Sequence, residues 1–154
     1  LEAGFPPAKL IINDRMDVAL ALSAGGVHLA GHSLPAAAAK PSVPQPMKTG
    51  VSVHSLAEAQ QAAAAGADYV LFGHIFPTPS KPGLPARGIH SLREMVSRLP
   101  VPVIAVGGIH ADNASAVLDT GCAGIAVISA VLSAANPLEA AKAIAARLTP
   151  AASA

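Results

Sequence analysis

Cysteine is almost absent from this chain of 154 residues, since Cys122 stands alone, and no disulfide bond can form within it. Tryptophan is absent, and aromatic residues make up only 3% of the composition. Charged residues are also scarce, at 12%, and the formal net charge is +1. A nucleic-acid surface needs a basic patch, so this composition argues against one. A chain without a disulfide framework is expected in the cytoplasm.

Long apolar runs are missing as well. No run reaches the roughly 18 residues that a membrane-spanning helix needs, and no secretory signal opens the sequence. We therefore expect neither a membrane nor a nucleic acid as a partner. The chain begins with Leu1 rather than Met, which predicts that it is processed or is a piece of something longer. The last four residues, 151–154, are expected to form a tail.

Apolar residues are abundant, at 52%, and they occur in short continuous runs separated by helix-like segments. Continuous runs predict strands that are buried on both faces, as in a parallel sheet covered by helices. A capping box at Ser55 and Glu58 marks the start of one helix, and Asn136 and Pro137 begin the last one. The expected strands are 9–13, 26–31, 49–54, 67–76, 101–109 and 122–132.

The even spacing of these strand–helix units decides the expected fold. An open doubly wound sheet and a closed (β/α)8 TIM barrel both fit the alternation. Short spacing, and strand ends that are polar or glycine-rich, favour the barrel. A closed barrel has eight units, and about six are present here. We therefore expect residues 1–150 to form a single partial TIM-barrel domain that lacks the first two units.

Parallel strands bring their carboxyl ends to one face, where barrels carry their chemistry. We therefore expect the residues at these ends to surround one cavity. Asn13 and Asp14 are either a turn or ligands for a metal or a polar group. The residues expected at the cavity are Asn13, Asp14, His28, His32, Ser33, Ser52, His54, Gly73, His74, Gly107, Gly108 and Ser129.

Two glycines after the strand "VPVIAV" predict a phosphate site. Gly107 and Gly108 would let backbone N–H groups approach an anion closely. The next strand ends in "VISA", where Ile128 and Ser129 could add further N–H groups. Loops after the last two strands of such barrels commonly hold a phosphate. A tight strand-to-helix turn without a ligand is the alternative.

The loop "PTPSKPG" (77–83) carries two hydroxyl groups and one ammonium group, on Thr78, Ser80 and Lys81. Its prolines stiffen it, which reduces the entropy lost when it closes on a ligand. His74 lies just before this loop, after Gly73, where a buried strand ends. An imidazole can take and give a proton near neutral pH, so we predict a catalytic role. A core histidine bonded to the backbone is the alternative.

The segments "LIINDR", "GVHLAGHSLP", "GVSVHSLAEA", "GADYVLFGHIFPTPSKPG", "VPVIAVGGI" and "GIAVISAVL" together resemble the thiamine phosphate synthase superfamily. The resemblance covers nearly the whole chain and implies a (β/α)8 barrel, of which these would be the third to eighth units. It also implies a tendency to form homodimers. One branch, the synthases, joins hydroxymethylpyrimidine diphosphate to a thiazole phosphate with Mg²⁺. The other branch, the tautomerases, aromatises a carboxythiazole phosphate.

The synthase pattern is matched at Asn13, Asp14, Ser52, Thr78, Ser80, Lys81, Gly108 and Ser129. The chain departs from it at Ser33, where the synthases have an aspartate that binds magnesium. It also departs at His74, where they usually have proline and where the tautomerases have their catalytic histidine. Asp14 alone would offer Mg²⁺ a single protein carboxylate, which is few for an ion with near-octahedral oxygen ligation.

These departures favour the tautomerase branch. We therefore expect an isomerase that aromatises a carboxythiazole phosphate, with His74 as general acid and base and no cofactor. Gly107, Gly108, Ile128, Ser129, Thr78, Ser80, Lys81, Asn13 and Ser52 would bind the substrate. Thiamine phosphate synthase is the alternative, with Mg²⁺ on Asp14. A relative that binds a phosphate ligand without catalysis is the second alternative.

Overall fold

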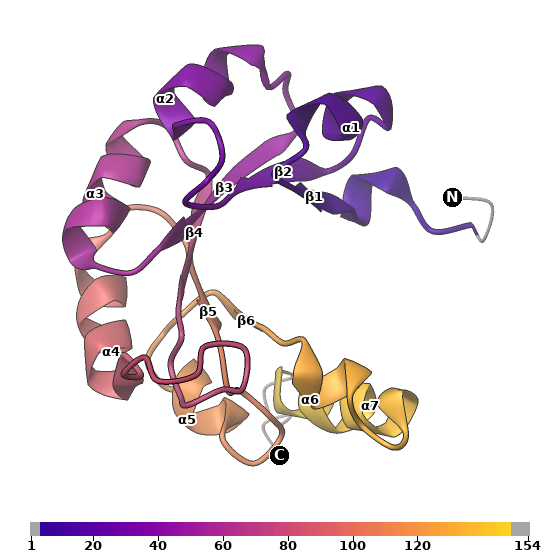
Figure 1. The fold of residues 1–154 in the computed structure, drawn as a ribbon, viewed down its shortest axis with the longest axis vertical. Coiled ribbons are helices and arrows are strands. Elements are labelled where there is room, and N and C mark those ends of the chain that lie inside the picture. The colour runs from indigo at the N-terminus through magenta and orange to yellow at the C-terminus, as the bar shows by residue number, and fades with distance from the viewer. Residues whose placement is uncertain (1–3, 149–154) are drawn as a thin grey trace, which may run out of the picture. The chain divides into compact units, whose positions relative to one another are not determined.

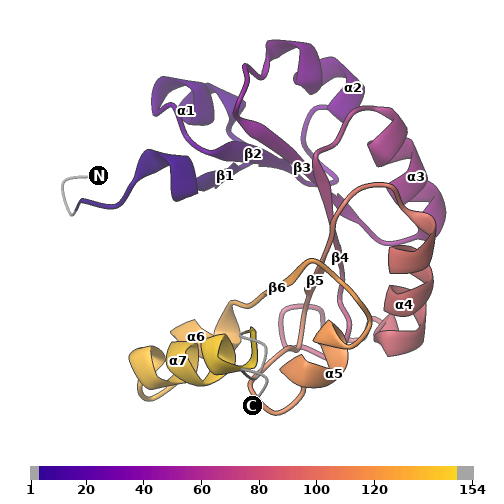
Figure 2. The ribbon, with the colours of Figure 1, turned by 180° about the vertical axis from the view of Figure 1, so that it is seen from behind.

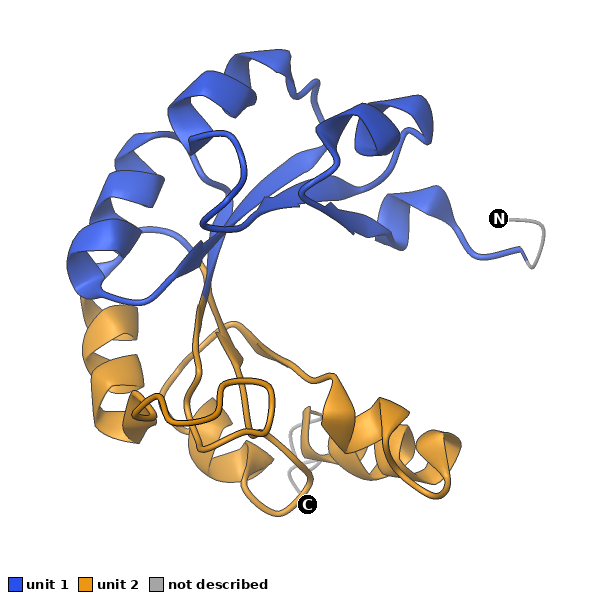
Figure 3. Ribbon diagram, viewed as in Figure 1, with its two compact units in different colours: residues 1–71, 99–101 blue, residues 72–98, 102–154 orange. Residues whose placement is uncertain are grey.

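The computed structural model describes residues 4–148. The chain divides into two compact units, shown in Figure 3. Unit 1 comprises residues 1–71 and 99–101, and unit 2 comprises residues 72–98 and 102–154. The expected tail, 151–154, lies outside the described residues, and a single domain over residues 1–150 stays a prediction.

Within residues 4–148, the strands follow chain order in a six-stranded sheet, β1-β2-β3-β4-β5-β6. In unit 1, β1 pairs with β2 and β2 with β3, and both pairs are parallel. In unit 2, β5 and β6 also pair in parallel. The strands are β1 (Ile11–Asn13), β2 (Gly26–Leu29), β3 (Lys48–Val53), β4 (Tyr69–Gly73), β5 (Val103–Val106) and β6 (Gly124–Ala126). This confirms the α/β class with a parallel sheet. A closed eight-stranded barrel is not shown.

Helices separate the strands, as the alternation predicts. The α-helices are α1 (Met16–Ala21), α2 (Ala36–Ala39), α3 (Leu56–Ala64), α4 (Gly88–Arg98), α5 (Ala114–Leu118), α6 (Ser129–Leu132) and α7 (Pro137–Leu148), with 3-10 turns at η1 (Pro7–Lys9) and η2 (Lys40–Ser42). Ser55 caps α3, because its hydroxyl accepts the Glu58 N–H at 3.2 Å. Among residues 4–148, none of the helices is both long and apolar enough to span a bilayer.

The core of unit 1 lies between β2 and the helices α1 and α2, which Figures 1 and 2 show on the same side of the strands. Ala19 of α1 and Ala39 of α2 are fully buried against Val27 and Leu29 of β2. Small alanines let these helices approach the sheet closely, which positions the carboxyl ends of β1 to β3.

The core of unit 2 is built from larger side chains. Leu92 and Met95 of α4 are buried, as are Val103 and Ala105 of β5. Both helix residues lie on one face of an amphipathic helix, three positions apart, which is the spacing that a core-facing stripe requires. This packing supports the loops that follow β4, β5 and β6.

Five of the six predicted strands are shorter in the structure, and two of them show why. The apolar run 122–132 contains the strand β6 and, from Ser129, the short helix α6. The backbone of Ile128 leaves the extended region, with φ −125° and ψ −78°, and so ends the strand. A continuous apolar run has no period that separates a buried strand from a buried helix. The run 67–76 is likewise a strand only over Tyr69–Gly73.

Candidate active site

A cavity of about 480 Å³ lies in unit 2, among the loops that follow β4, β5 and β6. It brings together three of the residues predicted from the sequence, Thr78, Gly108 and Ser129. The remaining predicted residues of unit 2 do not line it. Of these, Ser80 and Lys81 are exposed on the first loop, and the exposed Ile128 directly precedes Ser129. The cavity lining is Phe76, Pro77, Thr78, Pro79, Gly108, Ile109, His110, Asn113, Ser129 and Ala130.

The glycine pair has a steric reason to be glycine. Gly107 and Gly108 have φ values of +96° and +66°, in the left-handed region that side chains rarely adopt. A Cβ on Gly108 would lie 2.7 Å from the carbonyl oxygen of Pro77 and 2.8 Å from the Cβ of Phe76. The loops after β4 and β5 therefore touch through Gly108, and their close contact forms one wall of the cavity.

Asn113 fixes the loop after β5, and the sequence analysis missed it. Its Nδ2 donates to the carbonyl oxygen of Gly108 at 2.9 Å, and its Oδ1 accepts the His110 N–H at 2.9 Å. One side chain thus closes the turn on both sides of Ile109. The signal in the sequence was an asparagine at the start of the expected helix, a position where such residues bond to nearby backbone.

His74 connects the end of β4 to the far side of the "PTPSKPG" loop. Its side chain is buried, and Nε2 lies 3.2 Å from the carbonyl oxygen of Leu84. A carbonyl oxygen only accepts, so Nε2 carries the proton. The carbonyl oxygen of His74 in turn accepts the Arg87 N–H at 2.8 Å. These two bonds hold both ends of the segment that carries Thr78, Ser80 and Lys81.

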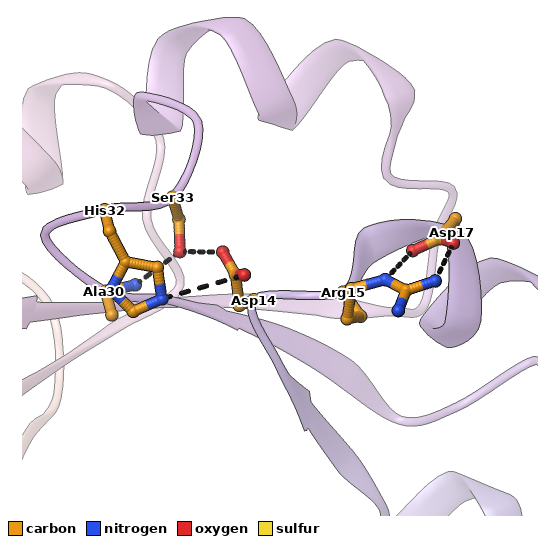
Figure 4. Close-up of polar contacts among 6 residues, drawn as sticks. All are labelled: Asp14, Arg15, Asp17, Ala30, His32 and Ser33. Carbon is orange, nitrogen blue, oxygen red and sulfur yellow. Dashed lines mark hydrogen bonds and ion pairs between the residues drawn. The ribbon is translucent and has the colours of Figure 1, made fainter.

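In unit 1, Asp14 stands at the end of β1 with a φ of +65°. Its Oδ1 accepts a hydrogen bond of 2.5 Å from the Ser33 hydroxyl, and its Oδ2 lies 3.7 Å from His32 Nε2 (Figure 4). The neighbouring Arg15 turns away and pairs with Asp17. Within residues 4–148, no group of three or more His, Cys, Asp or Glu side chains gathers to hold a metal ion.

Asn13 and Ser52 lie on the same sheet as Asp14. Asn13 is the last residue of β1 and is exposed, and its register partner on β2 is His28. His28 reaches the Ser52 hydroxyl with Nε2 at 2.8 Å. Burial lowers the pKa of His28 from its ordinary value of 6.5, so this imidazole stays neutral and serves as a hydrogen-bonding group.

Comparison with known proteins decides the family. The family model described as thiamine monophosphate synthase matches residues 6–131. This chain belongs to the thiamine monophosphate synthase family. A thiamine-phosphate synthase of Chlorobium phaeovibrioides is 49% identical over 138 residues, which are 89% of this chain and 66% of that protein. One of Pyrococcus furiosus is 46% identical over 127 residues, which are 82% of this chain and 61% of that protein.

A solved structure supports the assignment to the thiamine monophosphate synthase family. The thiamine phosphate pyrophosphorylase from Pyrococcus furiosus superposes with a TM-score of 0.82 at 42% identity. The superposition covers 90% of this chain and 66% of that one. The chain thus spans between 61% and 66% of the lengths of these three proteins.

The tautomerase interpretation is wrong. It rested on the departures at Ser33 and His74, yet relatives that are 46% and 49% identical are named thiamine-phosphate synthase. An isomerase activity is therefore not supported. The imidazole of His74 is hydrogen-bonded to the Leu84 carbonyl oxygen, as in the alternative of a core histidine bonded to the backbone.

Proposed function

We propose that this protein is a thiamine-phosphate synthase, which couples hydroxymethylpyrimidine diphosphate to a thiazole phosphate. The observation that carries the proposal is the identity of 49% to a protein of that name over 89% of the chain. In this reaction the bond between the pyrimidine methylene carbon and the diphosphate oxygen breaks. The thiazole nitrogen forms the new bond to that carbon, and pyrophosphate leaves with the electron pair. No proton transfer is needed. This agrees with the hydrogen bond that engages His74 Nε2 with the Leu84 carbonyl oxygen.

In this proposal unit 2 binds the thiazole phosphate in the cavity beside Gly108. Among the described residues, the Gly108 N–H makes no hydrogen bond to another protein group, so it is available to an anion. Backbone N–H groups in such turns form anion-binding concavities. Thr78 and Ser129, which both carry a hydroxyl group, line the same cavity. Gly107 shapes the turn, and the Ile128 backbone leads into Ser129.

The reaction also requires stabilisation of the leaving group. Pyrophosphate carries several negative charges, so positive charge near the breaking bond lowers the barrier. Lys81 and Ser80 are exposed on a loop that His74 anchors at Leu84 and at Arg87. We assign Lys81 to charge neutralisation and Ser80 to hydrogen bonding with a substrate oxygen. Small-molecule phosphates are the partners that this chemistry implies.

In this proposal, residues of unit 1 bind the metal ion and the pyrimidine diphosphate. The Asp14 carboxylate is about one-third exposed, and among the described residues it pairs with no Lys or Arg, so it fits a cation. Magnesium is commonly held by one or two carboxylates plus substrate phosphates, and Asp14 with the Ser33 hydroxyl would hold it here. When bound, the ion neutralises charge on the leaving pyrophosphate. Asn13 and Ser52 are assigned to the pyrimidine diphosphate.

The test is an assay of the full-length protein with both substrates and Mg²⁺. Pyrophosphate release and thiamine phosphate formation should be equimolar, and each should need both substrates and the metal. The variant Lys81→Met keeps the apolar stem and removes the charge, and should reduce kcat about 10²–10³-fold. Lys142, an exposed lysine paired with Glu139 on α7, provides the control substitution Lys142→Met. Substrate binding without turnover would reject the synthase and leave a binding protein.

A further inference from the structure

Three side chains from neighbouring strands of unit 1 form a continuous hydrogen-bonded chain. The imidazole of His28, on β2, contacts the Ser52 hydroxyl of β3 through Nε2, at 2.8 Å. Its Nδ1 lies 3.3 Å from the hydroxyl of Tyr69, on β4. The rings of His28 and Tyr69 also stack, with centroids 5.8 Å apart and an angle of 28° between their planes. Both nitrogens of one imidazole are thus engaged by hydroxyl groups.

Gly50 makes room for this arrangement. It lies between Thr49 and Val51 on β3, and its register partner on β2 is His28. A Cβ at Gly50 would overlap the ring and hydroxyl of Tyr69. The Tyr69 ring therefore lies directly over a backbone segment without a side chain, which holds its hydroxyl against His28. The contact is built into the sheet and does not depend on a loop.

The direction of the protons along this chain follows from the donor strength of its two hydroxyl groups. A neutral imidazole has one N–H donor and one acceptor nitrogen. Either Tyr69 donates to Nδ1 and Nε2–H donates to Ser52, or both bonds run the other way. In the second arrangement the Tyr69 proton needs another acceptor. The Ser52 proton needs one in the first arrangement, and among the described residues neither hydroxyl contacts an acceptor besides the His28 imidazole. A phenol is a stronger donor and a weaker acceptor than an aliphatic hydroxyl, which favours Tyr69 as the donor to Nδ1 and Ser52 as the acceptor from Nε2–H. The first arrangement is therefore the stable one.

We propose that Tyr69 and His28 are positioning residues that commit Ser52 to donating its hydroxyl proton to the pyrimidine diphosphate substrate. With its oxygen accepting from Nε2–H, the Ser52 hydroxyl keeps its own proton for a ligand. The ligand atom that takes this proton must then be an acceptor, either a ring nitrogen or a diphosphate oxygen. This inference rests on the proposed synthase function, and it names the kind of substrate atom that Ser52 serves.

The first test measures the proton on His28 directly. Long-range ¹H–¹⁵N correlation spectra of the full-length protein show which ring nitrogen is protonated, and His28→Gln assigns the signal. We expect the proton on Nε2 in the wild type and a mixture of both tautomers in Tyr69→Phe, which keeps the stacked ring. A wild-type proton on Nδ1 would overturn the proposal. This measurement needs no substrate.

The second test measures coupling. Ser52→Ala should weaken binding of hydroxymethylpyrimidine diphosphate roughly 3- to 10-fold, and Tyr69→Phe should do so by less. The double variant should bind no worse than Ser52→Ala alone, because both changes act through the same hydrogen bond, the one that Ser52 donates to the substrate. If the losses of binding free energy in the two single variants add up in the double variant, Tyr69 does not act through Ser52. That result would reject the proposal. Thr49→Val is the matched control: it deletes a fully buried hydroxyl from the same strand and should leave affinity unchanged.

Two further probes separate the sources of the acceptor atom. Inorganic pyrophosphate supplies only phosphate oxygens, and hydroxymethylpyrimidine supplies only the ring. The probe that binds more weakly to Ser52→Ala than to the wild type identifies the acceptor. If neither probe nor hydroxymethylpyrimidine diphosphate binds more weakly to Ser52→Ala, the inference is contradicted. If the wild type binds none of the three, the synthase function fails, whereas the tautomer of His28 is still decided by the spectrum.

Discussion

The imidazole of His74 donates a hydrogen bond to the carbonyl oxygen of Leu84, ten residues further along the chain. This bond spans the loop that carries Thr78, Ser80 and Lys81, and it uses the proton that an acid–base catalyst would need to release. The histidine is thus an anchor for a loop of hydroxyl and ammonium groups. In the proposed ring-coupling reaction this loop would contact the phosphates, so its anchoring would bear on substrate affinity.

Loss of this anchor should loosen the loop. His74→Ala should speed hydrogen exchange of the Arg87 and Gly88 amides roughly 2- to 12-fold, the range expected for one lost hydrogen bond. His74→Gln retains a donor and should restore much of the protection. Exchange measured by NMR provides the test, with the Ile75 amide, which is bonded to Val106, as an internal control. Equal exchange in all three proteins would show that the bond does not hold the loop.

A side chain at Gly108 should damage both stability and phosphate binding. Gly108→Ala places a Cβ against Pro77 and Phe76 at a φ of +66°. Left-handed backbone costs an alanine roughly 1–2 kcal/mol, and the collision should add about 1–3 kcal/mol. Chemical denaturation gives the free energy of unfolding, and calorimetry gives the affinity for the thiazole phosphate.

Gly83→Ala is the control for this experiment. Gly83 has a φ of +75°, but nothing lies within 4 Å of the position that its Cβ would take. It should incur the backbone cost of roughly 1–2 kcal/mol without moving the two loops. If both variants lose the same stability and the same affinity, close contact at Gly108 does not shape the cavity.

Acidification should destabilise unit 1 through His28. Burial lowers the pKa of this imidazole below its ordinary value of 6.5, so between these two values the unfolded chain binds a proton that the folded chain does not. The free energy of unfolding therefore is highest above pH 6.5 and falls as the pH decreases below it. Urea unfolding between pH 7.5 and 5 should show this decline, and His28→Gln should flatten it. A wild-type slope that survives unchanged in the variant would assign the effect to other groups.

Asp68 should be a major electrostatic contributor to unit 1. Burial raises its pKa, but hydrogen bonds from Lys40 and from the Thr49 N–H outweigh this, and the net pKa is lowered. One carboxylate oxygen, Oδ2, accepts both bonds, at 2.5 and 2.8 Å. Asp68→Asn should lower the free energy of unfolding by about 1.5–3 kcal/mol. Glu139→Gln, in an exposed pair with Lys142, should cost less than about 0.5 kcal/mol. Similar losses would contradict a special role for Asp68.

Removal of the Asp14 carboxylate should weaken the binding of Mg²⁺ in the proposed reaction. Asp14→Asn keeps the size of the side chain and should lower activity about 100-fold or more, with a higher Mg²⁺ concentration needed for half-maximal rate. Asp17→Asn is the matched control, because Asp17 is occupied by Arg15 on the surface. Activity that survives chelation of Mg²⁺, or that is lost equally in both variants, would exclude Asp14 as the metal ligand.

Local sequence patterns were sufficient for the order of the elements. Apolar runs identified the strands, and Ser55 with Glu58 identified the start of α3, because capping and burial act over a few neighbouring residues. The glycine pair and the hydroxyl loop also pointed to Gly108, Thr78 and Ser129, which line one cavity. The same patterns led to the wrong tautomerase interpretation, since they show where a histidine lies but not what its ring nitrogens contact.

By itself, then, the sequence determined that this is an α/β protein with parallel strands and a set of polar strand ends, because those properties arise from contacts between near neighbours in the chain. Only the tertiary structure decided which of these side chains meet. His28 and Tyr69 are 41 residues apart, and Ser33 reaches Asp14 across 19 residues. Hydrogen bonds over such separations leave no period in the sequence, because they depend on how strands align side by side in the folded sheet.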